Sequence, residues 1–147
     1  MKFMDKMMGA LLGGALVMGA LALPATAVAG HDPLVKTRVV IQVSDVRPED
    51  WTLALNNAKN FQAATKGDAI IEIVAYGPGI GMLTMDSEVA DRVSAAVDSG
   101  VKIVACQNTM RAKKLTKADM NAKIGYVPSG VVELVERQEE GYSYIRP

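Results

Sequence analysis

The strongest constraint on the fold is a regular exchange between apolar, β-branched runs and segments with helical periodicity. Residues 39–43 lie in the run TRVVIQVS, residues 69–77 read AIIEIVAYG, and residues 101–106 read VKIVAC. Each run is apolar at nearly every position, which is typical of a strand covered on both faces. The sequence therefore predicts three buried strands in its central part.

Amphipathic helices are predicted after the first two strands. Pro48 suits the first turn of a helix that ends near Gly67. Ser87 is placed to cap a second helix, which Gly100 ends. The side chains expected to face the core are Trp51, Ala54, Leu55, Ala58 and Phe61 in the first helix and Val89, Val93, Ala96 and Val97 in the second.

The C-terminal third continues the alternation with shorter elements. A short helix is predicted from Thr116 through Met120, followed by a strand over residues 123–127. Ser129 is expected to cap a last helix, and the final strand lies in residues 142–147, at an edge where Pro147 is tolerated. The side chains of this last helix expected to point inward are Val131, Val132, Leu134 and Val135.

Strands that alternate with helices through short connections favour parallel pairing with right-handed crossovers. The fold expected for residues 30–147 is a single three-layer α/β domain with a mostly parallel sheet of about five strands. Its 118 residues are the size of one domain with one core.

Residues 1–29 have the pattern of a signal peptide. Lys2 and Lys6 precede an uncharged stretch that Pro24 breaks, and small residues then form cleavage sites that end at Ala29. An uncleaved membrane anchor is the alternative, because the uncharged stretch is long enough to span a bilayer. We expect cleavage after Ala29 and a soluble periplasmic protein without stable membrane insertion.

Composition excludes several classes of function for the mature chain. Without Lys2, Lys6 and Asp5, 14 basic and 15 acidic side chains remain, and this balance does not suggest nucleic acid or an anionic membrane as a partner. The single histidine, His31, lies in the expected N-terminal tail, so neither a cysteine–histidine dyad nor a metal site is predicted. No cofactor is implied.

Cys106, the only cysteine of the chain, is the candidate nucleophile. Ligands of parallel sheets gather beyond the carboxyl ends of the strands, and Cys106 ends the third strand. A helix start after it would aim free amides, including those of Asn108 and Thr109, at the sulfur and favour the thiolate. The alternative is a packed, inert thiol, because cysteine is among the most buried residue types.

Two neighbouring segments have alternative interpretations. Gly77 and Gly79 begin a glycine loop that is either a simple turn or a place where backbone amides approach a ligand. Residues 111–123 carry a local charge of +4, which would attract anions or would simply be a solvated helix face. The apolar side chains of Met82, Leu83 and Met85 follow the glycine loop, where they would cover the site or contact another subunit.

The order of elements over residues 37–146, VAYGPGIGMLT after the second strand and VKIVACQNTM after the third resemble the DsrE/DsrF-like family. The resemblance implies a small α/β domain that forms trimers or hexamers. In the sulfur-relay branch of that family, the cysteine at the end of the third strand carries sulfur as a persulfide. By position, Cys106 is then the sulfur-bearing residue, with Gly77, Gly79, Asn108 and Thr109 as its ligand-binding neighbours.

Three functions follow from these observations. The first is a periplasmic thiol protein that binds or carries sulfane sulfur on Cys106 and exchanges it with a donor or acceptor, as a carrier more than as a turnover enzyme. The second is a non-catalytic module that binds small anions beside an inert Cys106, and the third is an oligomeric assembly module.

Overall fold

The structure, a computed structural model, describes residues 36–147. The predicted signal peptide, residues 1–29, lies outside the described residues. Five strands form one sheet: β1 (Thr37–Val43), β2 (Ala69–Ala75), β3 (Lys102–Cys106), β4 (Gly125–Val127) and β5 (Ser143–Ile145). Their order is β4-β3-β2-β1-β5, and every pairing is parallel. The predicted α/β architecture is confirmed, including the edge position of the last strand.

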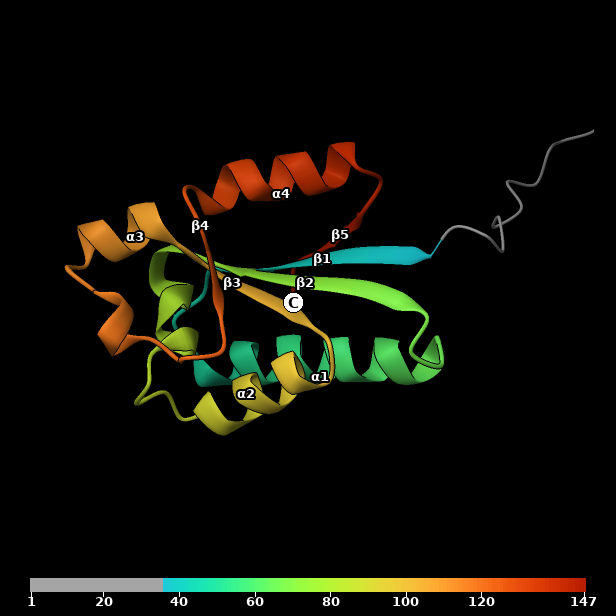
Figure 1. Cartoon of the computed structure of the whole chain (residues 1–147), viewed down its shortest axis with the longest axis horizontal. Helices are drawn as coiled ribbons and strands as arrows, with labels where there is room; N and C mark the ends of the chain where they lie inside the picture. Colours follow the sequence, from blue (N-terminus) through green and yellow to red (C-terminus); the bar gives the residue numbers. More distant parts are fainter. Residues whose placement is uncertain (1–35) are drawn as a thin grey trace, which may run out of the picture. The chain divides into compact units, whose positions relative to one another are not determined.

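Helices cover both faces of this sheet (Figure 1). Helices α1 (Pro48–Ala64) and α2 (Ala90–Asp98) lie on one face, and α4 (Gly130–Glu139) lies on the other. Helix α3 (Gln107–Ala112) and two 3-10 helices, η1 (Gly77–Leu83) and η2 (Lys117–Asp119), gather at the carboxyl ends of the strands. The three-layer arrangement therefore leaves the short helices at the edge where ligands bind in such sheets.

The core is divided by the sheet into a large and a small part. The large part lies under α1 and α2 and includes Ile41, Ile73 and Ile103, each at most 1% exposed. The small part lies under α4 and consists of Val40, Val74, Val104, Val127 and Leu134. Because few apolar side chains pack beneath α4, this helix depends on other contacts for its position.

The prediction that Val131, Val132 and Val135 point inward is wrong. These valines are 57%, 49% and 50% exposed, and Leu134 is the apolar side chain of α4 that is buried. The inward stripe consists of Gly130, Glu133, Leu134 and the partly buried Arg137, at three-to-four spacing. Charged side chains face the sheet here because β2 presents the buried Glu72 to them.

Several local predictions about helix caps and loop side chains are confirmed only in part. Helix α2 begins at Ala90 with Val89 at the N-cap, so Ser87 lies in the preceding turn and does not cap the helix. Ser129 does hold the N-cap of α4, but its side chain makes no capping hydrogen bond. Met82 and Leu83 are fully buried because η1 turns them into the core, whereas Met85 is 66% exposed.

Within residues 36–147, no helix combines the length and apolar character needed to cross a membrane.

Leu134 and Val135 are adjacent on α4 and provide a matched test of its packing. We expect Leu134→Ala to lower the free energy of unfolding by about 2–5 kcal/mol, because it leaves a cavity in the small core. The control Val135→Ala should change it by less than about 0.5 kcal/mol, because the side chain is half exposed. Urea denaturation measures both, and equal losses would contradict this orientation of α4.

Candidate functional site

Cys106 is held where β3 ends and α3 begins. It is the last residue of the strand, occupies the N-cap position of α3 and is 4% exposed. Alternation along the strand places its side chain on the same face as Val104, which is the face covered by α4. The thiol therefore lies between the starts of two helices, α3 and α4.

Hydrogen-bond donors from α3 and α4 lower the pKa of Cys106. Burial raises the pKa of this thiol, but hydrogen bonds from the Thr109 hydroxyl and from the backbone N–H groups of Gly130, Thr109 and Asn108 outweigh it. The net result is a pKa below the ordinary value for cysteine. Hydrogen bonds to the charged form stabilise it, so this environment favours the thiolate, which is the nucleophilic form.

Thr109 connects the thiol to the glycine segment after β2. Its Oγ1 accepts a hydrogen bond of 2.9 Å from the N–H of Gly77, which leaves the hydroxyl hydrogen to be donated to Cys106. Gly77 has a φ of +54°, a conformation that favours glycine. The amide of Gly77 is therefore engaged by Thr109, and its part in the site runs through that hydroxyl.

Gly79 is required by a close approach of two backbones. A Cβ at this position would lie 2.4 Å from the carbonyl oxygen of Val43, at the end of β1. The N–H of Gly79 donates to the carbonyl oxygen of Tyr76 at 3.1 Å. This glycine thus lets η1 pack against the end of β1 and holds the segment that carries Gly77.

The first residue of α4 supplies a donor that the sequence alone did not indicate. Gly130 is the first residue of α4 and is buried, and a Cβ on it would come within 3.0 Å of the side chain of Tyr76. The N–H of Asn108 also donates to the carbonyl oxygen of Pro128 at 3.2 Å, which ties the loop before α4 to the start of α3. Gly130 follows the predicted cap Ser129, but only the folding of α4 over β3 brings it to the sulfur.

The side chains of the remaining sequence candidates are exposed. The side chain of Asn108 is exposed and accepts a hydrogen bond from Arg111, so its contact with the thiol is through the backbone. The basic side chains of residues 111–123 are exposed, and Lys123 pairs with Asp98. The segment therefore forms a solvated surface.

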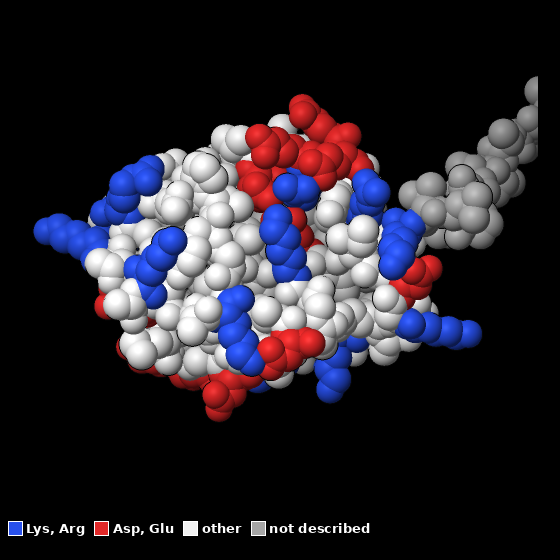
Figure 2. Space-filling view, in the orientation of Figure 1, with Lys and Arg blue, Asp and Glu red and all other residues white. Residues whose placement is uncertain are grey.

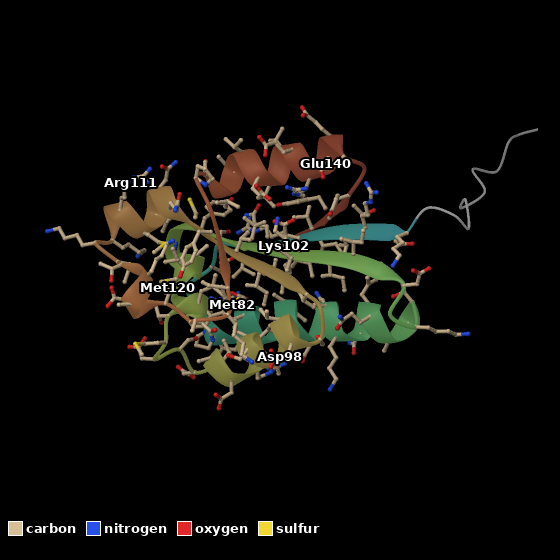
Figure 3. All side chains as sticks on the ribbon, viewed as in Figure 1. Met82, Asp98, Lys102, Arg111, Met120 and Glu140 are labelled. Atoms are coloured by element: carbon tan, nitrogen blue, oxygen red, sulfur yellow. The ribbon has the colours of Figure 1, made fainter. Side chains whose placement is uncertain are left out.

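An ionic cluster between α4 and the sheet is the other feature that the sequence alone did not indicate. It joins Glu72 of β2 and Lys102 of β3 to Glu133 and Arg137 of α4 and to Glu140, the C-cap of that helix. Figure 3 shows Lys102 on the sheet and Glu140 at the end of the helix above it, and Figure 2 shows acidic side chains gathered over α4. A glutamate inside the apolar run AIIEIVA was the signal in the sequence.

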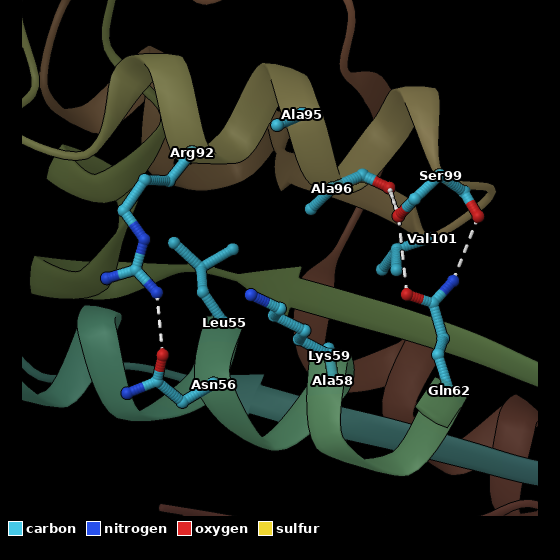
Figure 4. A pocket seen from close by; sticks show the side chains of 10 residues that line it. All are labelled: Leu55, Asn56, Ala58, Lys59, Gln62, Arg92, Ala95, Ala96, Ser99 and Val101. Carbon is cyan, nitrogen blue, oxygen red and sulfur yellow. Dashed lines mark hydrogen bonds between the residues drawn. The ribbon is translucent and has the colours of Figure 1, made fainter. Parts of the chain in front are cut away.

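A separate groove of about 390 Å³ lies between α1 and α2 (Figure 4). Leu55, Ala58 and Val101 are among the apolar residues that line it, and Lys59 and Arg92 reach into it from the two helices. Because α1 and α2 cover the other face of the sheet, this groove is not part of the Cys106 site. No group of three metal-ligating side chains occurs among residues 36–147.

The sequence profile described as the DsrE/DsrF-like family matches residues 38–147. No curated protein matches the chain significantly. Among solved structures, a protein of unknown function, MTH1491 from Methanobacterium thermoautotrophicum, is 37% identical with a TM-score of 0.73, and the match covers 76% of this chain and 99% of that one.

Two more distant structures share the fold. BT1422 from Bacteroides thetaiotaomicron, a conserved protein of unknown function, is 17% identical with a TM-score of 0.63, over 75% of this chain and 94% of that one. The ychN protein of E. coli is 8% identical with a TM-score of 0.64, over 77% of this chain and 100% of that one. At these identities the likeness concerns the architecture alone.

Removing the Thr109 hydroxyl should destabilise the thiolate form of Cys106. We expect Thr109→Val to raise the pKa of Cys106, because the side-chain hydrogen bond to the sulfur is lost while a side chain of similar shape remains. Thr109→Ser, which keeps the hydroxyl, is the control and should leave the pKa near that of the wild type. The rate of iodoacetamide alkylation as a function of pH measures it; an unchanged midpoint in Thr109→Val would show that the hydroxyl does not stabilise the thiolate.

Proposed function

Because the chain belongs to the DsrE/DsrF-like family, we propose that it is a thiol protein that accepts, holds and passes on sulfane sulfur as a persulfide of Cys106. The observation that carries this proposal is the place of one unpaired, buried thiol at the starts of α3 and α4, among hydrogen-bond donors that lower its pKa. A structural thiol in a core needs no such donors, because an uncharged S–H group packs as a small apolar group. Donors of this kind are useful when the sulfur carries negative charge.

The chemistry requires two nucleophilic displacements. The thiolate of Cys106 attacks a sulfane sulfur of a polysulfide, a new S–S bond forms, and the shortened polysulfide leaves with the electron pair of the broken S–S bond. A thiolate of an acceptor then attacks the outer sulfur of the persulfide, and Cys106 leaves as a thiolate. No net oxidant or reductant is consumed, and the protein acts as a carrier.

The chain's own residues would assist both displacements. The N–H groups of Gly130, Thr109 and Asn108 and the hydroxyl of Thr109 stabilise negative charge on the sulfur before the attack and again when Cys106 is the leaving group. Gly77 orients the hydroxyl by donating to its oxygen, and Gly79 holds the segment that contains Gly77. Cys106 is 4% exposed, so thiols in solution have limited access to it.

The direct test is mass spectrometry of the purified protein after exposure to polysulfide. We expect the wild type to gain the mass of sulfur atoms that dithiothreitol removes again, and Cys106→Ser to gain none, because the serine hydroxyl is a poor nucleophile for sulfur. Equal addition to both proteins, or none to the wild type, would contradict the proposal. An alkylation-resistant Cys106 together with anion binding that survives Cys106→Ala would instead support an anion-binding module.

We also propose that the protein is exported to the periplasm and assembles as a homo-oligomer. The basic start, uncharged stretch and small-residue sites of residues 1–29 support export, and the resemblance to trimeric or hexameric relatives supports assembly. N-terminal sequencing of the protein from a periplasmic extract should give Gly30 as the first residue. Recovery of the intact N-terminus in the membrane fraction would contradict this prediction and favour an anchor.

A further inference from the structure

Helix α4 donates a backbone N–H to Cys106 but has little apolar contact with the sheet. Leu134 is its buried apolar side chain, whereas its three valines are about half exposed. A helix in a domain is usually stabilised by packing of an apolar face. Contacts other than apolar packing must therefore fix the position of Gly130 beside the thiol.

Ion pairs between α4 and the sheet fix the position of the helix. Arg137 Nε lies 3.1 Å from Glu72 Oε2 on the central part of the sheet, and Lys102 Nζ lies 3.0 Å from Glu72 Oε1. Glu133 Oε1 accepts hydrogen bonds from Lys102 Nζ at 3.3 Å and from Arg137 Nε at 3.0 Å. Each of the two cations therefore contacts both carboxylates, and together they bridge two strands and two turns of α4.

Because the carboxylates of this network are buried, their charges need to remain paired. The side chain of Glu72 is 1% exposed and that of Glu133 is 9% exposed. Burial, together with the neighbouring carboxyl group of Glu133, raises the pKa of Glu72 in spite of the nearby Lys102. Removing one partner of a buried pair leaves an uncompensated charge. We expect α4 to shift, or water to enter beneath it, so that this charge is solvated.

The cluster lies too far from the thiol to act on it directly. Lys102 and Cys106 are four residues apart on β3, which corresponds to about 13 Å at the rise of a strand. Glu72 pairs with Lys102 in the register of the sheet and is therefore similarly distant. Gly130, in contrast, is one turn from Glu133 on the same helix.

We propose that Glu72 is a positioning residue, which through Arg137 and Lys102 fixes α4 on the sheet and thereby holds the N–H of Gly130 against the sulfur of Cys106. The inference rests on the proposed function for its relevance to sulfur transfer, but it concerns the thiol alone. The charged side chains that face Glu72 come from β3 and α4: Lys102, Glu133 and Arg137. Through them, a central strand controls the reactivity of the thiol at its carboxyl edge.

Direct electrostatics and positioning predict opposite changes for Glu72→Gln. Removing a negative charge, by Coulomb interaction alone, stabilises a distant thiolate and lowers the pKa of Cys106. Loosening α4 weakens the hydrogen bond from Gly130 and raises that pKa. The sign of the shift therefore separates the two explanations.

The experiment is the pH profile of iodoacetamide alkylation of Cys106 in the full chain. We expect Glu72→Gln to shift the midpoint upward and to reduce the alkylation rate below the midpoint about tenfold, the effect of one pKa unit on the thiolate fraction. Glu136→Gln removes the same charge from an exposed position of α4 and is the matched control, which should leave the profile unchanged. A downward or absent shift in Glu72→Gln overturns the proposal.

Arg137→Lys provides the second variant in case Glu72→Gln does not fold. It keeps the charge, but an ammonium cannot reach Glu72, Glu133 and Glu140 with the geometry of a guanidinium. We expect an upward shift of the midpoint in the same direction as for Glu72→Gln, with the far-ultraviolet circular dichroism of the wild type. A wild-type midpoint in a folded Arg137→Lys overturns the proposal.

The same measurements separate this proposal from the proposed function. Iodoacetamide reports on the thiol without any sulfur donor, so a wild type that gains no sulfur would refute sulfur transfer and leave the positioning result intact. Wild-type persulfide formation combined with unchanged alkylation profiles in both variants would refute positioning and leave sulfur transfer intact.

Discussion

The parallel pairing of β2, β3 and β4 is the constraint on which the thiol site depends. Parallel strands place their carboxyl ends at one edge, and the register aligns Ala75 with Ala105 and Cys106 with Val127. The segments that follow these strands therefore converge, and they supply the Gly77–Thr109 hydrogen bond and the Gly130 N–H at the sulfur. A shift of register by one residue would turn Cys106 to the opposite face of the sheet.

The two faces of the sheet are stabilised differently, and this difference concerns the site. The face under α1 and α2 is a broad apolar core, whose stability comes from burial of many aliphatic side chains. The face under α4 has a small apolar cluster beside an ionic network with a buried glutamate. Apolar packing is tolerant of small adjustments, whereas ion pairs in a desolvated site require specific geometry. The face that holds the thiol is thus the one with the stricter geometric requirements.

The proposed sulfur chemistry uses the same physical elements as the fold. Backbone N–H groups at helix starts have no partner within their own helix, so they are available to a thiolate at low cost. Burial opposes the charged form of Cys106, and the donors more than compensate for it. The resulting thiol is shielded but ionisable, which are the two properties that a persulfide carrier needs.

The sequence by itself determined the strands, the parallel α/β architecture, the family and the place of Cys106 at the end of β3, because these depend on local periodicity and on short connections. It did not determine which residues of α4 face the sheet, since the valines that indicated an apolar stripe are exposed and Glu133 and Arg137 point inward instead. That choice depends on Glu72, which is distant in the sequence and becomes a neighbour of α4 only in the folded sheet. The position of Gly130 beside the sulfur was likewise decided by the tertiary structure, because it brings the start of α4 to the end of β3.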